Sequence, residues 1–385
     1  MLYYLMQYLE AQFQPPGFQV IQFITVRAAL AAITALFISM IIGRRIIRWL
    51  AAKQIGESVR EGIHAGSVDH SHKSGTPTMG GLIIVFAVLG ATVLWGAIAE
   101  VYVWLACVAT AWMAAFGFAD DYIKVVKQDK SGLPARIKLI GQLSLGLFVG
   151  VIIYFHPAFQ EFNTLTYLPF VAGETLDYNF LGDLFGGVDL GWVIYIPVVV
   201  FIVTAVSNGV NLTDGLDGLA AGTTGIVALG LTVLAYTAGN AIFADFLNET
   251  LLLGAGELAV FTLALAAACF GFLWYNGFPA SVFMGDTGSL ALGAAVGTST
   301  LLIRKELLLP LLCAVFFVES LSVIIQTGWF KYTRKKTGTG RRVFRMAPIH
   351  HHWEAGGMHE NKIVVRFWIV TAITVVATLL ILRIR

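Results

Sequence analysis

Acidic side chains stand at unusual places in this 385-residue chain, beside glycines and at the ends of long apolar runs. Asp120 and Asp121 are adjacent at the end of one such run, where charge is costly and usually functional. Two neighbouring carboxylates repel one another unless a cation lies between them. On a helix, Lys124 lies at i+4 and i+3 from the pair, within side-chain reach. The alternative is an ordinary acid–base pair at a helix end.

A polar repeat follows the apolar run that ends near residue 208. Asn208, Asn211, Asp214 and Asp217 recur at every third position, interspersed with glycines. No Lys or Arg lies among them, so these amides and acids require an external partner. A metal, a nucleoside or a sugar fits this set, and a plain loop is the alternative.

A third polar segment connects two later apolar runs and contains Asn276, Phe283 and Asp286. Phe283 offers an aromatic face that could stack on a base. Asp286 stands at an expected helix N-cap, where exposed N–H groups and the helix dipole favour phosphates and other anions. An N-cap without further function is the alternative for Asp286.

Three consecutive histidines, His350, His351 and His352, lie in a polar loop near the C-terminus. Successive side chains cannot all ligate one ion in most backbone geometries, which disfavours a zinc site. General acid catalysis or contact with phosphates fits better. Lys73, in the segment 71–81, is a point charge suited to a phosphate.

The elements that must position these residues are membrane helices. The chain is 57% hydrophobic and 12% charged, with a mean hydropathy of +0.78, whereas a soluble domain carries about 25% charge. This composition excludes a soluble globule and a disordered chain, and the net charge of +2 gives no sign of nucleic-acid binding. The three cysteines lie far apart in apolar runs, so neither disulfides nor a zinc site is indicated.

We predict an all-α integral membrane protein that forms one polytopic domain over residues 1–385. A spanning helix needs about 20 apolar residues. Ten ranges are candidates: 21–42, 79–98, 101–118, 138–155, 191–208, 218–237, 256–275, 288–303, 307–328 and 363–382.

Lys and Arg gather between spans 1 and 2, between spans 3 and 4, and most densely between spans 9 and 10. Positively charged loops stay in the cytoplasm. Both termini are therefore expected outside, residues 1–20 at the interface, and 156–190 as an external loop with little local structure. All the polar clusters then fall on the cytoplasmic face. Carboxylates there suit Mg²⁺ bound together with phosphates, which indicates phosphoryl transfer.

Six sequence motifs stand out: FADDYIKV at 118–125, NLTDGLDGLA at 211–220, MGDTGSLALG at 284–293 and RMAPIHHHWE at 345–354, with SHKSGTPTMGG at 71–81 and VVRFWI at 364–369. They resemble the motifs of the polyprenyl-phosphate N-acetylhexosamine-1-phosphate transferases, and within them the bacterial phospho-N-acetylmuramoyl-pentapeptide transferases. The resemblance covers essentially the whole chain.

The resemblance implies transfer of phospho-N-acetylmuramoyl-pentapeptide from its UDP carrier to undecaprenyl phosphate. Lipid I and UMP would be the products, with Mg²⁺ required, in the bacterial inner membrane during peptidoglycan synthesis for the cell wall, cell shape and division. It implies that Asp286 binds the metal and that Asp120 and Asp121 are paired catalytic acids.

The resemblance also assigns the remaining site residues. His350 joins the catalytic set and Asp214 joins Asp286 at the metal. The resemblance assigns contacts with the substrates to nine residues: Lys73, Lys124, Asn211, Asp214, Asp217, Asn276, Phe283, His351 and His352.

Two other functions stay open at this point. A sister transferase would use UDP-N-acetylglucosamine, and the Ala-Pro-Ile-His-His-His segment at 347–352 argues against it. An ion-coupled transporter would place paired acids near mid-span, whereas these lie at one edge, and no internal repeat is evident. The sequence gives no oligomeric state, and a homodimer is one alternative.

Overall fold

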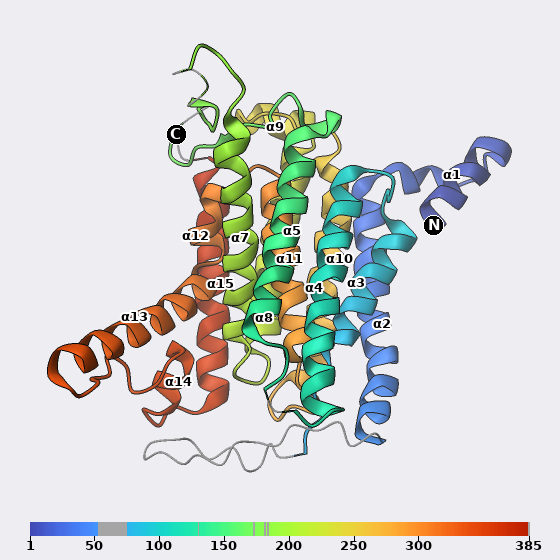
Figure 1. Cartoon of the computed structure of the whole chain (residues 1–385). Helices are drawn as coiled ribbons and strands as arrows, with labels where there is room; N and C mark the ends of the chain where they lie inside the picture. The colour runs from blue at the N-terminus through green and yellow to red at the C-terminus, as the bar shows by residue number, and fades with distance from the viewer. Residues whose placement is uncertain (53–74, 130, 172–173, 181, 183–184, 384–385) are drawn as a thin grey trace.

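The computed structural model describes residues 1–52, 75–129, 131–171, 174–180, 182 and 185–383. Most of these residues lie in helices that run side by side as one bundle (Figure 1). The first half forms α1 (Leu2–Phe13), α2 (Ile24–Ala52), α3 (Gly81–Trp95), α4 (Val101–Val125) and α5 (Ala135–Phe155). The second half forms α7 (Gly191–Thr213), α8 (Leu219–Ala238), α9 (Ala241–Leu247), α10 (Leu258–Asn276), α11 (Gly285–Leu302), α12 (Leu309–Leu312), α13 (Ala314–Thr337), α14 (Ile349–Glu354) and α15 (Glu360–Ile381).

Short elements complete the chain. Single 3₁₀ turns lie at Phe18–Gln22, Pro157–Phe159, Ala255–Glu257 and Glu306–Leu308. In the stretch 156–190, β1 (Leu165–Tyr167) pairs antiparallel with β2 (Thr175–Asp177), with Thr166 opposite Leu176. The sequence prediction of limited local structure in this stretch is confirmed by this small hairpin.

The protein is a membrane protein with several apolar helices. Within the described residues, seven helices are long and apolar enough to cross a bilayer: α2, α4, α5, α7, α8, α15 and the segment Ala255–Asn276 that contains α10. The range Glu306–Thr337 would add an eighth, although it is bent. The two remaining predicted ranges also contain helices, namely α3, which has only 15 residues, and α11.

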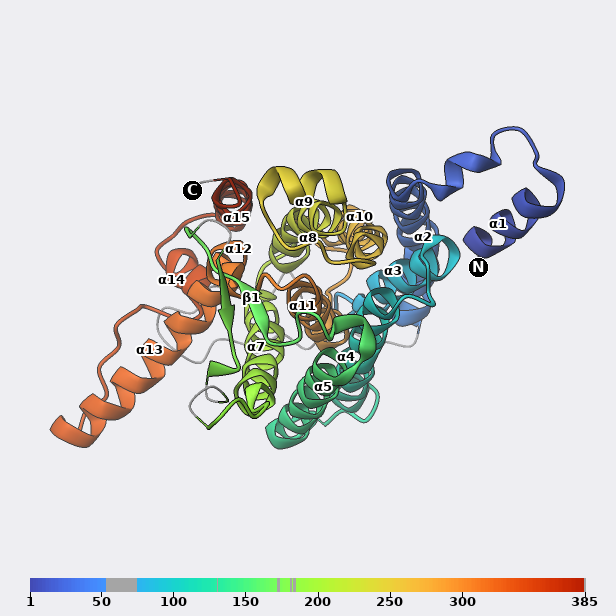
Figure 2. The ribbon, with the colours of Figure 1, turned by 90° about the horizontal axis from the view of Figure 1, so that it is seen from above.

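Helix α11 lies in the middle of the bundle, in contact with α3, α4, α7 and α8 (Figure 2). Every residue from Thr287 to Leu302 is buried. Small residues permit this close packing, because a Cβ added to Gly81 would lie 2.1 Å from the backbone nitrogen of Gly288. A Cβ on Gly293 would lie 2.4 Å from the Cα of Ser207.

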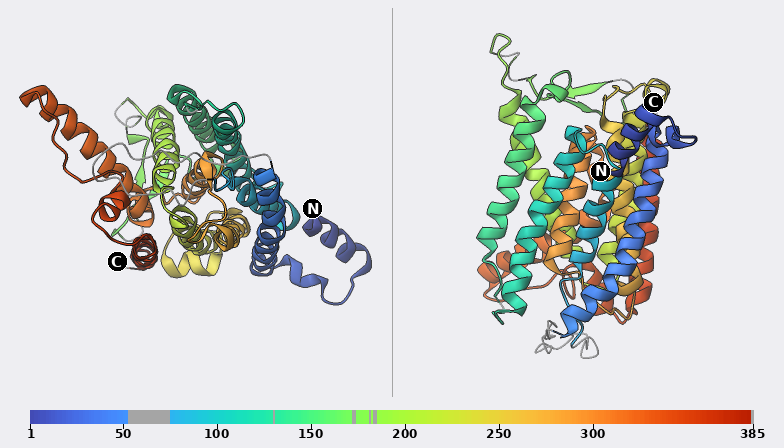
Figure 3. Two further views of the ribbon diagram at one scale, coloured as in Figure 1. Left: turned by 90° about the horizontal axis from the view of Figure 1, so that it is seen from below. Right: turned by 90° about the vertical axis from the view of Figure 1, so that its right-hand side faces the viewer.

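The predicted ninth span, 307–328, is not one continuous helix. α12 and α13 meet at an angle of 79° around Cys313, and α13 extends away from the other helices (Figure 3). α12 packs against α15, so this part of the range stays with the bundle while α13 leaves it. Hydropathy alone cannot predict this bend, because both arms are apolar near the break.

The two ends of the bundle differ in chemistry. α1, the hairpin and the last turn of α15 lie at one end, and the α4–α5 connection and α14 lie at the other (Figures 1 and 3). The second end also holds the carboxyl end of α4 and the amino end of α11, which carry the acids. The predicted gathering of the acidic motifs at one end of the helices is therefore confirmed for the described residues.

Candidate functional site

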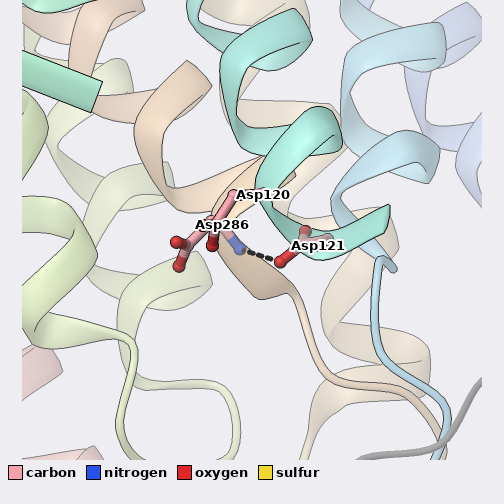
Figure 4. Close-up of side chains that lie close together, drawn as sticks. All are labelled: Asp120, Asp121 and Asp286. Carbon is pink, nitrogen blue, oxygen red and sulfur yellow. Dashed lines mark hydrogen bonds between the residues drawn. The ribbon is translucent and has the colours of Figure 1, made fainter. Parts of the chain in front are cut away.

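Three carboxylates from two helices meet at this end of the bundle (Figure 4). Asp120 and Asp121 occupy the last turns of α4, and Asp286 lies in the first turn of α11. Each offers an oxygen within 4.8 Å of the others. Asp120 and Asp121 are 0% and 3% exposed, while the side chain of Asp286 is 17% exposed. Asp286 is thus the member of the group that a solvent-borne ligand can reach.

Two lysines link Asp120 to Asp286. Lys124 Nζ lies 2.5 Å from Asp120 Oδ2 and 3.3 Å from Asp286 Oδ2. Lys138 Nζ, from the first turn of α5, lies 2.9 Å and 2.5 Å from the same two oxygens. The predicted i,i+4 contact of Lys124 with Asp120 is confirmed. Lys138 belongs to the Lys and Arg residues between predicted spans 3 and 4, and no sequence motif marks it as a site residue; its position at the same end of the helices as Asp120 is the signal that could have found it.

Asp121 has a different role in the fold. Its Oδ1 accepts a hydrogen bond from the backbone N–H of Asp286 at 3.1 Å. Its Oδ2 accepts from the Thr287 N–H at 2.8 Å and from the Thr287 hydroxyl at 2.6 Å. Asp121 of α4 therefore caps the amino end of α11 from outside that helix.

The prediction of an N-cap at Asp286 is wrong. α11 begins at Gly285, and Asp286 lies in its first turn, with its carboxylate directed to α5 and α7 rather than to its own backbone. Asp286 does not need to cap α11, because Asp121 already accepts hydrogen bonds from the backbone N–H groups of Asp286 and Thr287. The alternative that Asp286 serves only as a helix cap is therefore wrong as well.

Asn211 near the end of α7 completes this cluster. Its Nδ2 donates to Asp286 Oδ1 and to Ser289 Oγ, both at 2.9 Å. Asn208, one turn earlier, instead exchanges hydrogen bonds with Gln142 of α5 at 3.0 and 3.1 Å. Within the polar repeat, Asn211 therefore binds the acidic cluster, whereas Asn208 links α7 to α5.

The loop 214–218, which joins α7 to α8, is held by several neighbouring segments. Glu360 Oε1 accepts from the Asp217 N–H at 2.7 Å, and Asp217 Oδ2 accepts from the Ala280 N–H at 3.0 Å. Asn276 Oδ1 accepts from the Gly218 N–H at 3.0 Å, while its Nδ2 donates to the Val282 carbonyl. Asp217 and Asn276 thus fix the loop against the segment that leads into α11.

The three histidines have separate surroundings. His350 is completely buried, and its Nδ1 lies 3.0 Å from Glu319 Oε2 of α13. Burial lowers the pKa of the His350 imidazole, although Glu319 opposes that shift, so the neutral ring is favoured. His351 Nδ1 lies 2.8 Å from Glu354, and His352 Nδ1 accepts from the Arg345 N–H at 3.0 Å. The His350 and His351 rings lie close, with centroids 4.2 Å apart, but each of the three rings has a different polar partner.

The last two predicted site residues are Phe283 and Lys73. Phe283 is half-buried, and its backbone pairs with Pro77 and Gly80 at 2.8 Å each, which places its backbone beside the start of α3. Lys73 lies outside the described residues.

The donor set of the acidic cluster fits a hard divalent cation. Carboxylate oxygens are the ligands that such ions prefer, and three lie within reach of one another. Asp286 is the most accessible of the three, whereas Asp121 accepts from the amino end of α11 and Asp120 accepts from the Leu133 N–H at 2.7 Å and contacts both lysines. Asp214 does not belong to this group, so its predicted part in metal binding stays a prediction.

An apolar groove opens beside the histidine segment. It has a volume of about 370 Å³ and lies where α13, α14 and α15 meet. Val315 and Val318 of α13, Trp353 of α14, and Phe367 and Val370 of α15 line it. This lining is suited to a hydrocarbon chain, and Trp353 lies one turn after His350 on α14.

Comparison with known proteins yields two family matches and a set of full-length relatives. Residues 103–304 match glycosyl transferase family 4, and residues 73–85 match signature 1 of the phospho-N-acetylmuramoyl-pentapeptide-transferases. A phospho-N-acetylmuramoyl-pentapeptide-transferase of Salinibacter ruber is 65% identical, and proteins of the same name from Chloroherpeton thalassium and Flavobacterium johnsoniae are 50% and 45% identical. In each case the alignment covers 100% of both chains.

Proposed function

The chain belongs to the phospho-N-acetylmuramoyl-pentapeptide-transferase family, and from that membership we propose the reaction that it catalyses. It transfers phospho-N-acetylmuramoyl-pentapeptide from the UDP-linked donor to undecaprenyl phosphate, and releases UMP. The product is lipid I, the first membrane-bound intermediate of peptidoglycan synthesis.

The observation that carries this proposal is the Asp120–Lys124–Lys138–Asp286 cluster at the end of the helices. Both substrates are anionic phosphates, so their approach is opposed by charge. Lys124 and Lys138 offset that repulsion and hold the reacting phosphates close to Asp286. Asp120, buried between the lysines, keeps both ammonium groups in place.

We assign the metal of the reaction as Mg²⁺, held by Asp286 with Asp120 as the second ligand. When bound, the ion supplies charge stabilisation on the phosphates of the donor. Asn211 fixes the second oxygen of Asp286, so the carboxylate keeps one orientation. Asp121 contributes by holding the amino end of α11, on which Asp286 stands.

The donor nucleotide is assigned to the region between loop 214–218 and Phe283, with Lys73, His351 and His352 as further contacts. Phe283 offers a half-buried ring, and loop 214–218 offers amides and carboxylates to a ribose or a base. Asn276 supports both segments through the Gly218 and Val282 backbones.

The acceptor's chain is assigned to the apolar groove of α13, α14 and α15. The lipid cannot leave the bilayer, and the groove has hydrocarbon-like walls close to the polar loops. The phosphate of the acceptor then meets the donor at headgroup level.

The protein is assigned to the bacterial inner membrane with ten spans and external termini. The ranges 79–98 and 288–303 complete the ten as α3 and α11, which are protected from lipid by their neighbours. The acidic cluster then faces the cytoplasm, where UDP-linked sugars are found. A homodimer stays one alternative for its assembly.

The test is transfer by the purified full-length chain in lipid. With UDP-N-acetylmuramoyl-pentapeptide, undecaprenyl phosphate and Mg²⁺, we expect stoichiometric formation of UMP and the lipid product. UDP-N-acetylglucosamine as the sole donor should give no product. Product from that donor alone would favour the sister transferase, and no UMP from either donor would refute the proposal.

A further inference from the structure

Glu319 is an ionisable residue within an apolar helix that the acidic cluster does not use. It lies on α13, two turns after the bend, and is completely buried. Its Oε2 lies 3.0 Å from Nδ1 of His350, which is equally buried. A buried carboxylate is retained only where it has a partner, and within the described residues His350 is the partner found for Glu319.

The other side of the His350 ring faces loop 214–218. A Cβ added to Gly215 would lie only 2.2 Å from His350 Nε2. The loop backbone therefore packs against the Nε2 edge of the imidazole, and glycine is the residue that permits this approach. A change in the orientation of the ring would press on Gly215.

A carboxylate placed against one nitrogen of an imidazole restricts how the ring can turn. Here His350 Nδ1 lies 3.0 Å from Glu319 Oε2, and the opposite nitrogen, Nε2, faces the loop. Such partners of a functional group typically change affinity or activity by about 10–100-fold when removed. Glu319 thus affects the position of loop 214–218 through His350, without contacting a substrate.

We propose that Glu319 is a positioning residue that acts through His350 to hold loop 214–218 in the arrangement that binds the nucleotide of the donor. The proposal rests on the assignment of this loop to the donor. It predicts that loss of Glu319 weakens donor binding, whereas a purely structural Glu319 would lower only stability.

The experiment measures affinity for UDP-N-acetylmuramoyl-pentapeptide by calorimetry on the purified full-length chain, without acceptor. We expect Glu319→Ala to raise Kd about tenfold or more. Glu319→Gln keeps a polar group of the same size against the His350 ring, and should stay within about threefold of the parent value. Ser322→Ala is the matched control, because the Ser322 hydroxyl is buried on the same helix and donates only to the Glu319 carbonyl.

A second variant approaches the same contact from the loop. Gly215→Ala forces a methyl group against His350 and should raise Kd for the donor even if Glu319→Ala fails to fold. Unchanged donor Kd in a folded Glu319→Ala protein, or equal weakening by Ser322→Ala, would overturn the proposal. Absence of transfer by the parent protein, with donor binding that still depends on Glu319, would refute the proposed reaction and leave this inference intact.

Discussion

Replacement of Asp121 by alanine should destabilise the protein more than it changes the chemistry of the cluster. The carboxylate accepts three hydrogen bonds from the amino end of α11: two from backbone N–H groups and one from the Thr287 hydroxyl. Asp121→Ala removes both acceptor oxygens, and with them all three hydrogen bonds. The hydroxyl can rotate to another acceptor, but the two N–H groups at the helix terminus cannot.

The size of the effect follows from those two N–H groups. A hydrogen bond to a charged group is worth about 1.5–3 kcal/mol, and neighbouring losses are not fully additive. We therefore expect a loss of roughly 3–4 kcal/mol in the free energy of unfolding. At about 2–4 °C per kcal/mol for domains of intermediate size, the melting temperature should fall by about 10 °C.

The assay is thermal unfolding in one fixed detergent–lipid mixture. Asp121→Asn keeps one acceptor oxygen and should lose about half as much stability. Asp286→Asn is the matched control, because Asp286 lies one residue into the same helix but caps nothing; its oxygen can still accept from Asn211. An Asp121→Ala protein that unfolds at the parent temperature, but has lost activity, would refute the capping role and restore Asp121 as a catalytic acid.

Three further outcomes are expected. Asp286→Asn should abolish UMP release at every Mg²⁺ concentration, since an amide cannot replace the charge that a hard cation needs; a titration curve like that of the parent enzyme would exclude a metal role. In intact cells, an impermeant thiol reagent should modify Thr175→Cys but not Lys335→Cys, and the reverse pattern would overturn the assigned topology. Val318→Trp should fill the apolar groove and raise KM for the lipid acceptor while KM for the donor stays unchanged; an equal rise in both would contradict the groove assignment.

The sequence predicts the helices well because hydropathy is a local property. Each of the ten apolar ranges contains a helix, and the acids at their ends lie at one end of the bundle. The bend at Cys313 was not predictable in the same way. Pro310 lies in the first turn of α12 and not at the break, so the bend depends on the packing of α12 against α15.

The site was predicted in its residue types more than in its contacts. The sequence motifs single out both Asp121 and Asp286, but which of them caps α11 depends on how α4 and α11 approach each other, with Asp121 and Thr287 166 residues apart in the chain. Glu319 was overlooked, although an ionisable residue inside an apolar range is itself a signal. Its partner His350 lies 31 residues further on and only the folded chain brings the two together.

The central position of α11 has a consequence for how the protein is made. This helix is rich in Gly, Thr and Ser and is not among the helices apolar enough to cross a bilayer by themselves. During synthesis, α11 must therefore insert against helices that are already in the membrane. The four helices that contact α11, namely α3, α4, α7 and α8, all precede it in the chain. Lipid tails provide no hydrogen-bond partners for the Ser and Thr hydroxyls of α11, whereas neighbouring helices do. Synthesis order and final packing agree, since the helices that shelter α11 enter the membrane before it does.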